Sequence, residues 1–196
     1  MKRLFDLLLV VGTLWVWFPL LGLIAALVHW KLGTPVFFIQ PRPGRKGKVF
    51  PLIKFRTMTD ARAADGQLLP DGARLTPFGR WLRSTSLDEL PELFNVLCGH
   101  MSLVGPRPLL LRYLSRYSET EAVRHAVRPG LTGWAQVNGR NEASWEARFR
   151  LDREYVERQS LRFDAQIVWR TFWAVVRRHG ISASGQATKD EFRGTD

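Results

Sequence analysis

The hydrophobic positions divide this chain into a long apolar start and a mixed remainder. Leu7–Val28 contains no charged residue. At about 1.5 Å per residue, a straight helix over this stretch would reach roughly 30 Å, which is the thickness of a bilayer core. The pattern therefore predicts a membrane-embedded helix over residues 1–32.

The flanks of the apolar stretch argue against a simple crossing. Basic residues precede it and follow it: Lys2, Arg3, Lys31, Arg42, Arg45, Lys46 and Lys48. The positive-inside rule draws both flanks to the cytoplasmic side, and Pro19, in the middle of the stretch, is expected to kink a helix. We therefore expect a re-entrant helix bent at Pro19. An ordinary spanning anchor is one alternative. A cleaved signal peptide is a weaker one, because the stretch is long and no disulfide framework follows it.

Short apolar runs separated by turn residues follow Gly33. Runs 36–39 and 49–53 flank a cationic, glycine-containing stretch at 41–48, which predicts a β-hairpin with a basic tip. If the second strand continued to Met58, Lys54 and Arg56 would point to the same face. A charged edge that keeps strands from aggregating is the alternative reading of that face.

Helical patterns dominate the rest of the chain. We expect a loop over 60–74, a helix starting at Thr76 with proline at its first position, and a second helix over 86–99. Cys98 lies in an apolar run of that second helix and is expected to be a buried, inert thiol.

The pattern is again helical from residue 142, with an apolar stripe over 161–179 that is bordered by arginines. The stripe is typical of core packing or of docking on a membrane surface. The fold class expected is α+β and mainly helical, with a small globular domain over 33–181 that carries the hairpin and amphipathic interfacial helices. The polar tail, 182–196, is expected to be disordered.

The net charge of the chain limits the kinds of molecule that it is expected to bind. The chain has 29 Lys and Arg against 18 Asp and Glu, a net charge of +11. This excess favours anionic partners: anionic membrane lipids, phosphorylated metabolites or nucleic acid. The single cysteine excludes an intrachain disulfide, and no Cys/His cluster has the spacing of a zinc site.

An acidic pair stands out in this basic chain, Asp88 and Glu89 within Ser-Leu-Asp-Glu-Leu-Pro-Glu-Leu. Ser86 and Glu89 have the spacing of a capping box, so the pair could simply close a helix end. Arg107 lies between two prolines, which stiffen it for a bidentate contact to phosphate. A loop arginine that satisfies carbonyls is the alternative.

Several stretches together resemble one family. They are 54–58 (Lys-Phe-Arg-Thr-Met), 74–76 (Arg-Leu-Thr), 86–93, 95–97 (Asn-Val-Leu), 101–108 (Met-Ser-Leu-Val-Gly-Pro-Arg-Pro), 128–140 (from Arg-Pro-Gly-Leu-Thr-Gly-Trp to Asn-Gly-Arg) and 155–156 (Tyr-Val). In this order, and over nearly the whole chain, the sequence resembles the bacterial sugar transferase family, the small monotopic polyprenyl-phosphate phosphoglycosyl transferases.

The resemblance implies transfer of a sugar 1-phosphate from a UDP-sugar to undecaprenyl or a related polyprenyl phosphate, with release of UMP, as the first membrane step of glycoconjugate synthesis. It implies Mg²⁺ as cofactor, with Asp88 as nucleophile and Mg²⁺ ligand, and Glu89 assisting the acceptor. Phosphate or nucleotide contacts are implied for Lys54, Arg56, Arg83, Arg107 and Arg140. It also implies a catalytic domain on the cytoplasmic face of the bacterial inner membrane. One departure concerns the helix break, where the family often has Ser-Pro and this chain has Phe18 before Pro19.

Two other function classes fit the charge. A membrane-anchored protein that recruits anionic partners explains the basic surface but not the acidic pair. Nucleic-acid binding lacks a visible recognition module, so no specific nucleic acid is expected. The sequence carries no signal for the sugar transferred or for an oligomeric state.

Overall fold

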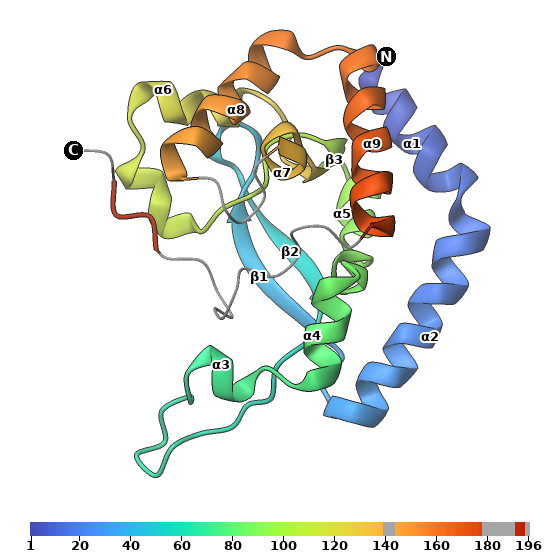
Figure 1. Cartoon of the computed structure of the whole chain (residues 1–196), viewed down its shortest axis with the longest axis vertical. Coiled ribbons are helices and arrows are strands. Elements are labelled where there is room, and N and C mark those ends of the chain that lie inside the picture. Colours follow the sequence, from blue (N-terminus) through green and yellow to red (C-terminus); the bar gives the residue numbers. More distant parts are fainter. Residues whose placement is uncertain (139–143, 178–190, 195–196) are drawn as a thin grey trace.

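The computed structural model describes residues 1–138, 144–177 and 191–194. It is mainly helical with two small sheets, which confirms the α+β expectation (Figure 1).

Two helices make up the N-terminal apolar segment, α1 (Lys2–Gly12) and α2 (Leu14–Leu32). The break between them lies at Thr13, and Pro19 lies inside α2, so the break is not at the expected position. Side chains serve the carbonyls near the break. The Thr13 hydroxyl donates to the Leu9 carbonyl at 2.6 Å, and the Trp17 indole N–H donates to the Val10 carbonyl at 2.8 Å. These donors allow the chain to bend here, because buried or lipid-facing carbonyls need partners.

One stripe of α2 packs on the rest of the molecule and the other faces are exposed. The buried side chains recur at helical spacing: Trp17, Leu21, Ile24 and Val28. With 19 residues and a mean hydropathy of 1.5, α2 is long and apolar enough to cross a membrane by length and composition. Large apolar side chains are exposed on both helices: Leu4, Leu8, Val11, Leu14, Trp15, Val16, Phe18, Leu23 and Trp30.

Polar contacts fix α1 to the globular part of the molecule. The Lys2 ammonium pairs with Asp164 at 2.5 Å, and Arg3 donates to the Leu97 carbonyl at 2.9 Å. The buried Asp6 carboxylate accepts from the Ser102 hydroxyl at 2.8 Å and from the Leu103 amide at 3.2 Å. The start of the apolar segment is therefore bound to the globular part of the molecule.

The hairpin expected after Gly33 is present. Strands β1 (Phe37–Pro43) and β2 (Val49–Phe55) pair antiparallel with Phe37 opposite Phe55, and the tip carries the short 3-10 turn η1 (Arg45–Gly47). Strand β2 ends at Phe55, so Arg56 lies beyond it. Side chains of β2 enter the main core, which also holds the buried stripe of α2.

The chain between the hairpin and the second sheet forms short helices. They are α3 (Asp71–Arg74), α4 (Pro77–Ser84), the 3-10 turn η2 (Leu87–Glu89) and α5 (Glu92–Leu97). Thr76 caps α4 by accepting from the Gly79 amide at 3.0 Å, as expected from Thr-Pro. The single helix expected over 86–99 is wrong, because Ser86 has a left-handed φ of 57° and a 3-10 turn precedes α5.

A second sheet holds the loop that carries Arg107. Strands β3 (Ser102–Val104) and β4 (Gly130–Thr132) are parallel. Glycines let the two backbones meet just after β3, since a Cβ on Gly105 would lie 2.4 Å from the Arg128 carbonyl oxygen and one on Gly130 would lie 2.0 Å from the Gly105 nitrogen. The elements between and after these strands are η3 (Leu111–Arg116), α6 (Glu119–Ala122), η4 (Val123–Ala126) and α7 (Trp134–Asn138).

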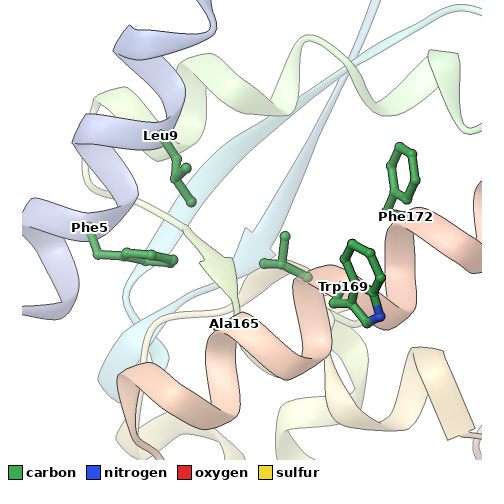
Figure 2. A pocket seen from close by; sticks show the side chains of 6 residues that line it. Phe5, Leu9, Ala165, Trp169 and Phe172 are labelled. Atoms are coloured by element: carbon green, nitrogen blue, oxygen red, sulfur yellow. The ribbon is translucent and has the colours of Figure 1, made fainter.

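Two longer helices end the described fold, α8 (Trp145–Arg158) and α9 (Leu161–Val176). The apolar side chains of α9 divide between a buried face, which confirms core packing, and an exposed face, for which docking on a membrane surface stays a prediction. Phe163 and Ile167 are buried against Val104 and Tyr155, while Trp169 and Phe172 are exposed. An open apolar hollow of about 420 Å³ lies between α1 and the outer face of α9, lined by Phe5, Leu9, Ala165, Val168, Trp169 and Phe172 (Figure 2).

Two smaller expectations are corrected. Cys98 is exposed, because α5 turns Leu93 and Val96 inward and ends at Leu97, which leaves Cys98 just beyond the helix on the outside. The disorder expected for 182–196 does not hold for residues 191–194. Phe192 there is 1% exposed and lies 5.0 Å from the Phe149 ring and 5.6 Å from the Tyr113 ring.

Candidate active site

The candidate site lies where β2, η2, α5 and the loop after β3 meet. Asn95 of α5 fixes two of these elements together. Its side-chain amide donates to the Pro51 carbonyl at 2.7 Å and accepts from the Ile53 amide at 3.1 Å. The buried side chain thus replaces a strand partner along β2, which fixes Lys54, the next residue, in front of η2.

Glu89 is held by two cations. Lys54 Nζ lies 2.8 Å from Glu89 Oε1 and 3.0 Å from Glu92 Oε1, and Arg107 also donates to Glu89 Oε1. The capping interpretation of Glu89 is therefore wrong: Ser86 is left-handed and makes no side-chain cap, and the carboxylate of Glu89 is bound to Lys54 and Arg107 instead. The alternative that Arg107 serves carbonyls is also wrong, because its guanidinium binds this carboxylate.

Asp88 differs sharply from its neighbour. It is 8% exposed, and its carboxylate makes no hydrogen bond or ion pair with the other residues that the structure describes. Burial, together with the charge of Glu89, raises the pKa of Asp88 to about 6, against the opposing charges of Lys54 and Arg107. At neutral pH, Asp88 is thus an ionised carboxylate with its oxygens unengaged.

The charges of Glu89 and Glu92 are set in opposite ways. Burial disfavours the charge on Glu89, but Arg107 and Lys54 outweigh burial and lower the pKa of Glu89. For Glu92, burial dominates the attraction of Lys54 and raises the pKa to about 7. Burial also works against the charge on Lys54, yet the two glutamates outweigh it and raise the pKa of Lys54. Glu89 is therefore firmly anionic and Lys54 firmly cationic.

The other three residues expected to bind phosphate have different positions. Arg83 of α4 donates from Nε to the Thr57 hydroxyl at 3.1 Å, and its charge acts on Asp88, so it belongs to the cluster. Arg56 points elsewhere, to the carbonyls of Leu32 and Thr34 at the end of α2. Arg140 lies outside the described residues.

Sequence reasoning missed two members of the site, Glu92 and Asn95, which are both 2% exposed. A signal for Glu92 was present. It follows Glu89 by three residues, so the two carboxylates fall on the same side of a helical turn. Asn95 carried no such signal, because its partners are main-chain groups of a distant strand.

The carboxylates of the site can be compared with the ligands that a magnesium ion needs. Within residues 1–138, 144–177 and 191–194, no group of three or more His, Cys, Asp or Glu side chains is placed to hold a metal. Among those residues, Asp88 is the buried carboxylate of the acidic pair that forms no ion pair with a cation. Since Mg²⁺ is commonly bound by one or two carboxylates plus substrate phosphates, this donor set fits a Mg²⁺ that arrives with a diphosphate.

Comparison with known proteins finds similarity to sugar transferases. The family profile described as bacterial sugar transferase matches residues 1–178. The chain is 50% identical over 195 residues to the uncharacterized sugar transferase EpsL of Bacillus subtilis, a match that covers 100% of this chain and 96% of that protein.

Two longer relatives have more specific names. The undecaprenyl-phosphate glucose phosphotransferase of Komagataeibacter xylinus is 42% identical over 184 residues, which cover 87% of this chain and 35% of that protein. The undecaprenyl-phosphate galactose phosphotransferase of Salmonella typhimurium is 39% identical over 198 residues, which cover 92% of this chain and 41% of that protein. This chain thus spans well under half the length of these two relatives.

Proposed function

Since this chain belongs to the bacterial sugar transferase family, we propose that it transfers a sugar 1-phosphate from a UDP-sugar to undecaprenyl phosphate and releases UMP, in exopolysaccharide synthesis or a related glycan pathway. The names of the Komagataeibacter and Salmonella relatives support the acceptor and the type of transfer. The observation that carries the proposal is the contrast within the acidic pair: Glu89 is bound by two cations while Asp88 is unengaged.

Asp88 is the nucleophile of the first step. One of its carboxylate oxygens attacks the sugar-proximal phosphorus of the UDP-sugar and forms a new P–O bond. The bond from that phosphorus to the bridging oxygen breaks, and UMP leaves with the electron pair. A positioned carboxylate can act in this way, although it is a weak nucleophile in water. The result is an aspartyl phosphosugar.

The second step returns the enzyme to its starting state. A phosphate oxygen of undecaprenyl phosphate attacks the same phosphorus, a diphosphate bond forms, and the bond to Asp88 breaks and restores the carboxylate. Glu89 assists the acceptor by helping to orient it, through the cations Lys54 and Arg107 that it holds in place. Dividing the reaction into two steps lets the water-soluble donor leave before the lipid reacts.

Cations stabilise both steps. Lys54, Arg83 and Arg107 surround the acidic pair and are placed to offset the charge that develops on the phosphoryl oxygens. The side chain of Arg107 is 36% exposed, against 17% for Lys54, so it offers the more open guanidinium face to a phosphate. Mg²⁺ bound by Asp88 and substrate phosphates would supply further charge neutralisation. Phosphate or nucleotide contacts by Arg56 and Arg140 stay predictions.

The N-terminal helices fit a re-entrant arrangement. Both ends of the apolar segment contact the catalytic domain, through Lys2, Arg3 and Asp6 at one end and through Arg56, which binds the Leu32 carbonyl, at the other. A segment that spans the bilayer would place its ends on opposite sides. We therefore place the chain on the cytoplasmic face of the inner membrane, with its helices bent at Thr13 and anionic lipids against its basic surface.

Trapping the intermediate tests the function. Purified protein is mixed with a UDP-sugar that is radiolabelled in the sugar-proximal phosphate, without acceptor, and quenched within milliseconds. We expect label on the polypeptide, release of one UMP per labelled chain, and discharge of the label when undecaprenyl phosphate is added.

The matched control is Asp88→Asn, which preserves size. We expect it to lose labelling and turnover by at least about a thousandfold. Full turnover by this variant, or a wild-type reaction that proceeds only with both substrates bound and never labels the chain, would refute the mechanism.

A further inference from the structure

The segment that carries Arg107 is held at three consecutive carbonyl groups. The Pro106 carbonyl accepts from the Gly130 amide at 3.0 Å, the Arg107 carbonyl accepts from Arg124 Nη2 at 2.7 Å, and the Pro108 carbonyl accepts from Arg42 Nη1 at 3.4 Å. The contact in the middle is the shortest. It also acts on the residue whose side chain binds Glu89.

Arg124 is itself fixed by a buried ion pair. Its side chain and that of Asp152 are each 3% exposed, and Arg124 Nη2 lies 2.9 Å from Asp152 Oδ2. Asp152 comes from the inner face of α8, together with Phe149 and Tyr155. Arg124 Nη1 donates to the Tyr117 hydroxyl at 3.3 Å, and the guanidinium lies 5.8 Å from the Tyr117 ring and 5.5 Å from the Phe149 ring.

This arrangement needs an arginine. One planar group contacts a carboxylate, a main-chain carbonyl and a hydroxyl while it lies against two aromatic rings. A lysine ammonium has no planar fork and could not hold these positions together. A buried ion pair often stabilises a fold no more than apolar residues of equal volume would, because taking two charges out of water is costly.

We propose that Arg124, fixed by Asp152, is a positioning residue of the transferase site. It holds the main chain of Arg107, and thereby the contact between Arg107 and Glu89. The contacts run from Asp152 on α8 to Arg124, then to the Arg107 carbonyl, and from the Arg107 guanidinium to Glu89. Helix α8 thus helps to set the acidic pair, although it contributes no side chain to the pair itself. The kinetic test of this proposal rests on the proposed function, because it measures sugar-phosphate transfer.

The kinetic test is a double-mutant cycle between Arg124→Lys and Arg107→Lys. In the wild-type background we expect Arg124→Lys to lower kcat by about tenfold to a hundredfold, since a charge-assisted hydrogen bond is lost, with KM for the donor changed less. In the Arg107→Lys background we expect the same substitution to cost less than about twofold, because the group that it positions is already altered.

Tyr117→Phe is the matched control. It removes the other hydrogen bond of the same guanidinium and leaves the contacts to Asp152 and to the Arg107 carbonyl, so we expect kcat within about threefold of wild type. Equal losses from Arg124→Lys in both backgrounds would show that Arg124 only stabilises the fold, and an unchanged kcat in the wild-type background would also overturn the proposal.

A second measurement does not depend on activity. In a crystal structure of the Arg124→Lys variant, we expect the Arg107 guanidinium to have left Glu89 while α8 and β3 keep their places. Arg107 still bound to Glu89 in that variant would refute positioning. If the wild-type protein transferred no phosphosugar, the proposed function would fail, and this structural readout would still decide the role of Arg124.

Discussion

The candidate active site and the N-terminal helices depart in opposite directions from the usual distribution of charged and apolar side chains in folded proteins. Around η2, the molecule buries charge: Asp88, Glu92, Arg124 and Asp152 are all less than 9% exposed. Along α1, α2 and the outer face of α9, it exposes large apolar side chains, such as Trp15 and Trp169. Folded proteins normally avoid both, because each costs free energy in water.

Together, the charged site and the exposed apolar helices are typical of a protein that binds at the interface between water and a membrane. The cations beside the acidic pair, Lys54, Arg83 and Arg107, suit an anionic diphosphate, while exposed tryptophans and leucines suit hydrocarbon. The polar contacts of Lys2, Arg3 and Asp6 join the two regions. A reaction between a soluble nucleotide sugar and a lipid phosphate needs both surfaces in one small protein.

Among the substitutions that test this comparison, the largest expected effect comes from removing Lys54, the cation that contacts both glutamates. Lys54→Met leaves the buried Glu92 without its cation and Glu89 with Arg107 alone. We expect transfer to fall by about a hundredfold or more and the free energy of unfolding to fall by about 3 kcal/mol, because a buried charge loses its partner. UMP release and chemical denaturation in detergent measure the two effects.

Lys48→Met is the control for this substitution. Lys48 is an exposed lysine of the same hairpin. We expect it to leave both measurements close to wild type. Equal losses from the two variants would mean that loss of net charge, rather than the ion pairs of Lys54, explains the effect.

The apolar region is tested by adding a charge. Phe18 of α2 is 56% exposed, and Phe18→Lys should weaken binding to vesicles by about 2.5–3.5 kcal/mol if this face lies in hydrocarbon. Vesicle flotation measures the bound fraction. Leu114→Lys, at an exposed apolar residue of η3, is the control and should bind as wild type does. Equal binding by the Phe18 variant would place that face in water.

The smallest expected effect is a shift in pH dependence. In the proposed mechanism Asp88 must be ionised to attack, and burial together with the charge of Glu89 raises its pKa to about 6, so the burst of UMP release should fall as pH is lowered through about 6. In Glu89→Gln, the neighbouring negative charge is gone, while the charges of Lys54, Arg107 and Arg83 still act on Asp88. The acid limb should then move to lower pH. A limb that stays in place would show that a group other than Asp88 controls the burst.

Much of the fold followed from local pattern. Thr76-Pro77 predicted the start of α4, the paired apolar runs predicted the hairpin, and the apolar spacing after Leu161 predicted α9. Such features depend on neighbours within a few residues. The site residues Asp88 and Glu89 followed from the motifs of the resemblance, and local pattern alone favoured a capping role for Glu89.

Long-range contacts decided the rest. Whether Glu89 closed a helix or bound cations depended on Lys54, 35 residues earlier, and on Arg107, 18 residues later. The break at Thr13 depended on side-chain donors that reach back along the helix, and neither Asn95 nor Arg124 could be assigned a role before their main-chain partners were known.

The sequence by itself thus determined the elements, the family and the acidic pair, because periodicity and motifs are properties of short stretches. Only the tertiary structure decided which carboxylate is neutralised and which is unengaged. The charge state and reactivity of a side chain depend on burial and on charges within a few ångströms, and in this protein those charges come from distant parts of the chain.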